Sequence, residues 1–210
     1  TDLLNGLSAA YLSDPGRHAA DALALLLEGV KIFPDNPNHW NNLGYVFTLG
    51  RRWDEAQAAY EKALAISPDL ALAERNLAAL PAQSGRPRAP ILDVLSDLRA
   101  LDAAVARRDF SESTLSLAAS VARRAPTTAK ARFINGSLLL LRGRAAEAIP
   151  ELEAAARKEG GRVAGRVNLG KAYAALGRVA DAEKQFRLAL GAEPGNASAQ
   201  QALRELRPTR

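Results

Sequence analysis

The chain has 210 residues, of which 28 are Lys or Arg and 23 are Asp or Glu, so its formal net charge at neutral pH is +5. It contains no cysteine, which excludes disulfides, thiolate chemistry and cysteine-based metal sites but does not distinguish cytoplasm from periplasm. There is no long uncharged apolar run and no signal-peptide pattern, so we expect a soluble protein without a membrane span. The chain begins at Thr1 and has no methionine, from which we expect a processed or trimmed piece of a longer product.

The best-defined pattern runs from Trp40 to Pro68. A glycine inside a helix costs about 1 kcal/mol relative to alanine, so we expect a neighbouring helix to approach closely at Gly44, and likewise at Ala56. Pro68 ends the second helix because proline cannot extend the hydrogen-bond ladder. Three aromatic side chains are expected to fill the space between two antiparallel helices: Trp40, Phe47 and Tyr60.

This segment resembles a tetratricopeptide repeat, a 34-residue helix–turn–helix unit. The residues that carry the resemblance are Trp40, Leu43, Gly44, Phe47, Ala56, Tyr60 and Pro68. The resemblance implies an all-α solenoid, in which stability comes from the stacking of neighbouring repeats. It also implies a protein that holds other proteins, with the first helix of each pair lining a concave surface.

Weaker copies precede and follow this unit. Residues 3–36 form the first copy, and 70–80 begin a third first helix that is then cut off. Pro81, Gly85, Pro87 and Pro90 predict a turn-rich connector without a helix interior. Pro126, Gly160 and Pro194 are each 34 residues apart, which predicts repeats at 95–128, 129–162 and 163–196. In the first of these, Asp102 is expected at the glycine place and Thr114 at the alanine place, and 198–206 is expected to form a polar capping helix.

The sequence therefore predicts about five full repeats and a fragment, arranged in two lobes. Residues 1–80 form an N-terminal lobe of two repeats plus one extra helix, 81–94 a connector, and 95–210 a C-terminal lobe of three repeats plus a capping helix. Two first-type helices, 70–80 and 95–108, follow each other without a second helix between them. We expect the superhelix to break there, with 91–94 serving as a helical lead-in.

Charge divides at the same boundary. There are 8 basic and 10 acidic residues up to residue 90, and 20 basic and 13 acidic residues beyond it. A basic half suggests nucleic-acid binding, but most of the arginines fall at helix ends and turns, where they solvate the surface. No RNA-binding signature or series of exposed stacking aromatics accompanies them. We therefore do not expect nucleic acid as a partner.

The sequence offers no catalytic or metal constellation. His18 and His39 are the two histidines, and no carboxylate pair stands at ligand spacing beside either. We expect no cofactor, no metal and no enzymatic activity. Trp40 and Trp53 are assigned to the core, because both stand at places where the repeat packs an aromatic inside the helix pair.

The candidate partner-binding face is a stripe at i, i+3, i+7 and i+10 on the first helices. In the N-terminal lobe it comprises Tyr11, Asn38, Asn41, Tyr45, Thr48 and Arg75. In the C-terminal lobe it comprises Arg99, Lys130, Phe133, Ser137, Leu140 and Lys171. Asn42, Asn76 and Asn168 recur at one place of the unit, where they either grip a peptide backbone or serve the structure of the repeat.

In the C-terminal lobe, Phe133 and Leu140 form an apolar floor with Arg99, Lys130 and Lys171 as a cationic rim, which suits an acidic amphipathic segment. The predicted function is a non-enzymatic scaffold or adaptor that binds peptide segments of partner proteins in its concave groove. The alternative is a regulatory or targeting arm of a larger enzyme, and an RNA-binding helical repeat comes after both. The sequence leaves the oligomeric state open.

Overall fold

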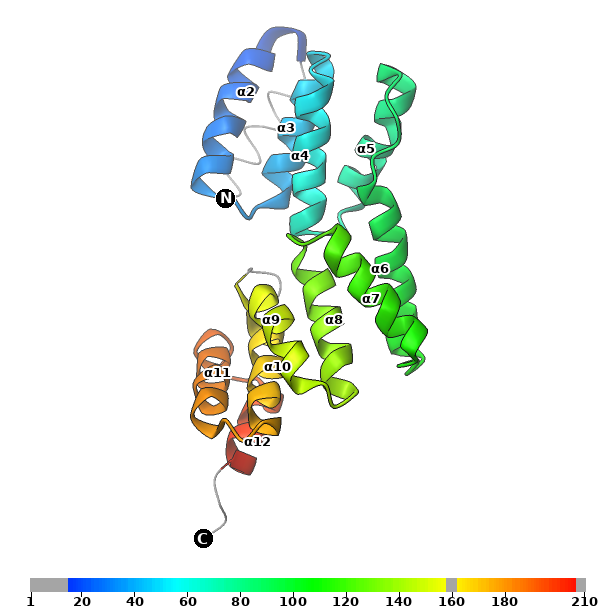
Figure 1. Cartoon of the computed structure of the whole chain (residues 1–210). Coiled ribbons are helices and arrows are strands. Elements are labelled where there is room, and N and C mark those ends of the chain that lie inside the picture. Colours follow the sequence, from blue (N-terminus) through cyan, green and yellow to red (C-terminus); the bar gives the residue numbers. More distant parts are fainter. Residues whose placement is uncertain (1–14, 158–161, 207–210) are drawn as a thin grey trace. The chain divides into compact units, whose positions relative to one another are not determined.

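The computed structural model describes residues 15–157 and 162–206, and within these ranges the chain is helical and contains no strand (Figure 1). The all-α fold expected from the sequence is confirmed. The helices are α2 (Pro15–Ile32), α3 (Pro37–Leu49), α4 (Trp53–Ile66), α5 (Ala71–Ser84), α6 (Ile91–Ala106), α7 (Glu112–Arg124), α8 (Ala129–Leu141), α9 (Ala145–Ala156), α10 (Arg162–Ala175), α11 (Val179–Ala192) and α12 (Ala197–Leu206). None of the helices in the described ranges is long and apolar enough to cross a bilayer.

Three helix pairs share one packing arrangement: α3 with α4, α8 with α9, and α10 with α11. A glycine in the first helix faces a large buried side chain sixteen residues later in the second. A Cβ on Gly44 would lie 2.7 Å from the ring of Tyr60, and a Cβ on Gly170 would lie 2.5 Å from the ring of Phe186. On Gly136 it would lie 2.7 Å from Leu152. The close approach that the sequence predicts at Gly44 is therefore confirmed.

The turns inside these three pairs and inside the pair α6 and α7 each have one residue in the left-handed region, and in the first three it is followed directly by the residue that precedes the second helix. The left-handed residues are Arg51 (φ 55°), Arg108 (φ 56°), Gly143 (φ 73°) and Gly177 (φ 72°). After three of these turns an arginine pairs with a carboxylate one turn into the second helix: Arg52 with Glu55, Arg144 with Glu147, and Arg178 with Asp181. Because these pairs are half exposed, each contributes little to stability.

The pair α6 and α7 departs from this arrangement, and the expected alignment of Asp102 with the glycine place is wrong. Arg108 N–H donates to the Val105 carbonyl as Gly143 N–H donates to Leu140, so the two turns are 35 residues apart. Leu101, which is fully buried, therefore stands at the glycine place. At the end of α7, Ala125 N–H bonds Val121 as Ser67 N–H bonds Ala63, which puts buried Ala118 at the place of Tyr60. The large and small residues are exchanged between the two helices.

The chain divides into two compact units, 1–95 and 96–210. The sequence places a connector at 81–94, whereas the non-helical stretch between α5 and α6 is 85–90. Pro81 lies inside α5 because it removes only one backbone donor, and the helix ends instead at Gly85, whose φ of 71° allows its N–H to bond the Pro81 carbonyl. No second helix separates α5 from α6, since 85–90 is described throughout, and the break of the superhelix stays a prediction.

Candidate functional site

In the first unit, the predicted stripe on α3 is only partly open to solvent. Asn38 is exposed, Tyr45 is 38% exposed and Thr48 is half-buried. Asn41 is buried. Arg75 is exposed on α5, and Tyr11 lies outside the described residues. The solvent-facing part of this stripe therefore consists of Asn38 and Tyr45, with Thr48 at its edge.

The amide of Asn41 is engaged within the unit. Its Oδ1 accepts a hydrogen bond from Asn76 Nδ2 at 3.0 Å, and its own Nδ2 donates to Asn42 Oδ1 at 3.2 Å. Thr48 Oγ1 donates to the Gly44 carbonyl at 2.9 Å and lies 3.2 Å from the hydroxyl of Tyr60, whose pKa burial raises to about 12. These contacts join α3 to α4 and α5.

Asn168 forms the corresponding link in the second unit. Its Nδ2 donates to Ser137 Oγ at 2.8 Å, so that an asparagine of α10 bonds a side chain of α8, the preceding first helix. Asn76 bonds α3 from α5 in the same sense. The sequence allows two roles for these asparagines: binding a peptide backbone, or holding the repeats together. The hydrogen bonds that Asn76 and Asn168 donate within the chain favour the second role.

In the second unit, the predicted stripe forms one continuous row on α8. We call it the α8 row: Lys130, Phe133, Ser137 and Leu140, all of which remain partly exposed. Their neighbours along the helix are buried: Ala131, Ile134, Asn135, Leu138 and Leu139. Two apolar side chains thus keep part of their surface in water on an otherwise well-packed helix.

The cationic rim is less positive than the sequence predicts. Lys130 Nζ lies 2.8 Å from Asp102 Oδ2 of α6, so its charge already has a carboxylate partner. Lys171 is exposed and its Nζ donates to Ser198 Oγ at 3.4 Å. Arg99 is exposed on α6. Lys171 thus differs from Lys130, because its hydrogen-bond partner is a hydroxyl and not a carboxylate.

The two tryptophans are not core residues, contrary to the sequence-based assignment. Both are partly exposed. The indole N–H of Trp40 donates to the Pro34 carbonyl at 2.8 Å, and Lys62 Nζ of α4 lies 5.8 Å from the centre of the Trp40 ring.

His39 is the one described histidine in the core, and it is completely buried against the Gly29 backbone of α2. Within the described residues neither of its ring nitrogens has a hydrogen-bond partner. Burial lowers the pKa of His39, and the nearby Gly29 backbone opposes this shift only in part. Among the described residues, no three carboxylate or histidine side chains are grouped so that they could hold a metal ion.

The sequence analysis missed a contact that recurs between repeats. The residue four places before the glycine position donates from its side chain to the carbonyl of the proline six residues earlier. The three donors are Trp40 to Pro34, Arg132 to Pro126, and Gln200 to Pro194, at 2.8, 3.4 and 2.9 Å. The signal in the sequence is a proline six residues before each donor, and Arg132 and Gln200 are 68 residues, or two repeats, apart.

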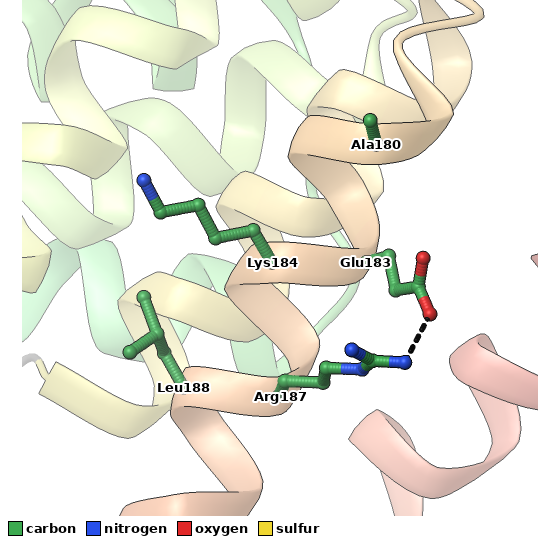
Figure 2. Close-up of a pocket in the computed structure, with 5 residues that line it drawn as sticks. All are labelled: Ala180, Glu183, Lys184, Arg187 and Leu188. Carbon is green, nitrogen blue, oxygen red and sulfur yellow. Dashed lines mark ion pairs between the residues drawn. The ribbon is translucent and has the colours of Figure 1, made fainter.

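Several hollows open on the second unit. One lies along the outer side of α11 (Figure 2), where Glu183 and Arg187 form an ion pair at 2.7 Å beside Lys184 and the 43% exposed Leu188. Another, of about 310 Å³, lies between α7, α8 and α9, and its carboxylates Glu112, Glu147 and Glu151 are each paired with an arginine. Ion pairs within the chain thus satisfy most of the charges at both.

The repeat geometry agrees with a comparison to known families. The sequence profile of the tetratricopeptide repeat matches residues 4–71 and 98–162, more than half of the chain. The chain belongs to the tetratricopeptide repeat family. A second profile of the same family matches residues 139–206. The resemblance predicted from Trp40–Pro68 is thereby confirmed.

Solved structures with this fold include the tetratricopeptide repeat domain of P58(IPK), with 15% sequence identity and a TM-score of 0.52 over 98% of this chain and 64% of that chain. YrrB, described as having an unusual peptide-binding site, has 16% identity and a TM-score of 0.44 over 96% of this chain and 90% of that chain. The TPR2AB domain of yeast Sti1 in complex with pHSP90 has 17% identity and a TM-score of 0.47, over 97% and 82%. At such identities the similarity concerns the fold alone. No curated protein matches the chain in sequence.

Proposed function

We propose that this protein is a non-catalytic adaptor that binds a peptide segment of a partner protein along the α8 row. Family membership supports the general class, because tetratricopeptide repeats are protein-interaction modules. The observation that carries the proposal is the partly exposed pair Phe133 and Leu140 on a helix whose other apolar side chains, apart from Leu141 at its end, are buried. Full burial of an exposed phenylalanine contributes about 1.5 to 3 kcal/mol, and completing the burial of a partly exposed one contributes up to about a third of this.

The side chains around the α8 row are small enough to leave space for a bound peptide. Small side chains are exposed on the neighbouring first helices: Ala103 and Ala106 on α6, and Ala164 on α10. A bound peptide would place an apolar side chain against Phe133 and Leu140. Such a peptide uses a few apolar anchors at regular spacing, as helices laid in grooves do.

We also propose that the peptide is acidic next to Lys171. The bond from Asn168 to Ser137 fixes how α10 and α8 are placed side by side, and Lys171 and Leu140 each lie three residues further along their helices. Lys171 is therefore expected beside the Leu140 end of the row. Because Lys130 is already paired with Asp102, Lys171 is the cation at which an acidic side chain gains most.

A selection of displayed peptides against the purified protein tests this function. The selected peptides should carry an apolar anchor with an acidic residue nearby. Their affinity should fall roughly 2- to 5-fold for Phe133→Ala, which follows from burial of the part of the phenylalanine that is still exposed. Leu188→Ala is the matched control, since Leu188 is exposed on the outer side of α11 (Figure 2) and should not affect affinity.

Leu188→Ala should keep the melting temperature close to that of the original protein, whereas Phe133→Ala should lower it because much of the ring already packs in the fold, so affinities are compared at a temperature where both variants are folded. If no peptide is selected, or if the selected peptides bind Phe133→Ala as tightly as the original protein, the α8 row is not the binding face. A large loss of melting temperature without loss of affinity would assign Phe133 to packing instead.

A further inference from the structure

A cavity of about 400 Å³ lies between α9, α10 and α11 in the second unit. It is lined by Glu153, Ala156 and Arg157 of α9, Arg166 and Leu169 of α10, and Gln185 of α11. Two guanidinium groups therefore face a single carboxylate. That carboxylate is already in use, because Glu153 Oε1 accepts a hydrogen bond from the Tyr173 hydroxyl at 2.9 Å.

In the preceding repeat the position equivalent to Arg166 is occupied by an arginine that is paired with a carboxylate. Arg132 and Glu151 stand 34 residues before Arg166 and Gln185. Arg132 Nη1 donates to both carboxylate oxygens of Glu151, at 2.9 and 2.7 Å, and the two side chains are only 25% and 18% exposed. In the last repeat the arginine is kept and the carboxylate is replaced by the amide of Gln185.

Among the described residues, the Nε donor of Arg166 has no acceptor. This Nε is buried and no described residue accepts from it, whereas Nε of Arg132 donates to the Pro126 carbonyl. In the described parts of the second unit no carboxylate lies within ion-pair distance of Arg166 or Arg157. A buried donor without an acceptor is unfavourable, and a guanidinium is best matched by a carboxylate, which it binds through two parallel hydrogen bonds.

We propose that this cavity binds a carboxylate, which supplies to Arg166 the negative charge that Glu151 supplies to Arg132 in the preceding repeat. Arg166 donates to the bound carboxylate, the amide of Gln185 donates a further hydrogen bond, and exposed Arg157 adds positive charge at the entrance. Leu169 and Ala156 contact the methylene groups next to the carboxylate. The carboxylate belongs to a glutamate side chain of a peptide or to a small free dicarboxylate, and both present the same group to the site. This proposal is independent of the one for the α8 row.

Titration with glutarate, followed by NMR of the arginine Nε–H signals, tests the proposal. The Arg166 Nε–H signal should shift on addition of glutarate, and Arg166→Gln should weaken glutarate binding at least tenfold. Arg132→Gln is the matched control, because Arg132 already has its carboxylate and its loss should leave glutarate binding unchanged. A pentapeptide with blocked ends and a central glutamate, compared with its glutamine counterpart, shows whether a peptide is the better source.

Gln185→Glu provides a second readout that does not depend on the ligand. It restores the pair seen one repeat earlier, so it should raise the melting temperature by a few degrees and abolish glutarate binding. The proposal is overturned if Gln185→Glu leaves both quantities unchanged, or if neither glutarate nor the glutamate peptide binds. It is also overturned if Arg166→Gln binds glutarate as tightly as the original protein.

Discussion

The ring of Tyr60 lies so close to Gly44 that a Cβ on residue 44 would stand 2.7 Å from two of its carbon atoms. Tyr60 is almost completely buried, so its ring has no space into which to move. Gly44→Ala gains about 1 kcal/mol of helix propensity, but overpacking a closed core costs about 1 to 3 kcal/mol or more. We expect a net loss of unfolding free energy of about 1 to 2 kcal/mol, measured by urea denaturation.

Gly191→Ala is the matched control for Gly44→Ala. Gly191 lies inside α11, and an added Cβ would have no atom within 4 Å. This substitution should therefore stabilise the protein by up to about 1 kcal/mol, because only the propensity gain remains. If the two substitutions have the same sign, the close approach at Gly44 does not govern the choice of residue.

The buried imidazole of His39 predicts that stability depends on pH. Burial lowers the pKa of His39 in the folded state below the ordinary value of 6.5. As the pH falls below 6.5, His39 becomes protonated in the unfolded chain but stays neutral in the folded chain. The free energy of unfolding therefore decreases as the pH falls towards the folded-state pKa. The slope for this residue is at most about 1.4 kcal/mol per pH unit.

Urea denaturation between about pH 7.5 and 5 measures this dependence. His39→Leu keeps an apolar side chain of similar size and should flatten the slope in this window, while His18 is retained in both proteins. An unchanged slope in His39→Leu would show that other groups cause the loss of stability. Above pH 6.5 the original protein should show no contribution from His39.

The sequence predicts the paired helices because the glycine and its large partner are both visible at fixed spacing. Gly44 with Tyr60 and Gly170 with Phe186 follow from one rule, that a small residue must lie where two helices touch. The same rule fails at Asp102, because counting by 34 assumes that all repeats are equally long. From Arg108 to Ala125, the residue that caps α7, the chain is one residue longer than from Arg51 to Ser67, so counting by 34 misses Leu101 by one residue.

The candidate sites are less predictable, because they depend on which polar groups are already paired. A helical stripe identifies Asn41 and Lys130 as members of a face, but only the structure shows that Asn76 bonds Asn41 and that Asp102 pairs with Lys130. The exchange of Glu151 for Gln185 is present in the sequence at 34-residue spacing. Its meaning requires the contact between Glu151 and Arg132, which joins two helices.

The buried amide of Asn41 predicts a structural cost in the first unit. Asn41→Ala removes an acceptor for Asn76 and a donor for Asn42, and it leaves the Asn76 amide without that partner. We expect a loss of about 1 to 3 kcal/mol of unfolding free energy. Asn38→Ala, at an exposed position three residues earlier in α3, should change the unfolding free energy by less than about 0.5 kcal/mol. Equal effects of the two substitutions would mean that the Asn41 bonds contribute nothing to stability.

The proposed pairing of an acidic peptide with Lys171 predicts an effect on association rate. Lys171→Glu should slow the association of the selected acidic peptides several-fold at low ionic strength, measured by stopped-flow fluorescence, because charges at the rim of an interface act mainly on the encounter. In about 0.5 M salt the difference should disappear, since screening then acts within a few ångströms. Lys184→Glu makes the same change of net charge on the outer side of α11 (Figure 2) and is the control.

If Lys184→Glu slows association as much as Lys171→Glu, the effect comes from the net charge of the protein and the peptide does not pass Lys171. If neither variant changes the rate at low salt, the bound segment carries no acidic residue at this face, whereas a slower rate for Lys171→Glu alone places its acidic side chain beside the Leu140 end of the α8 row.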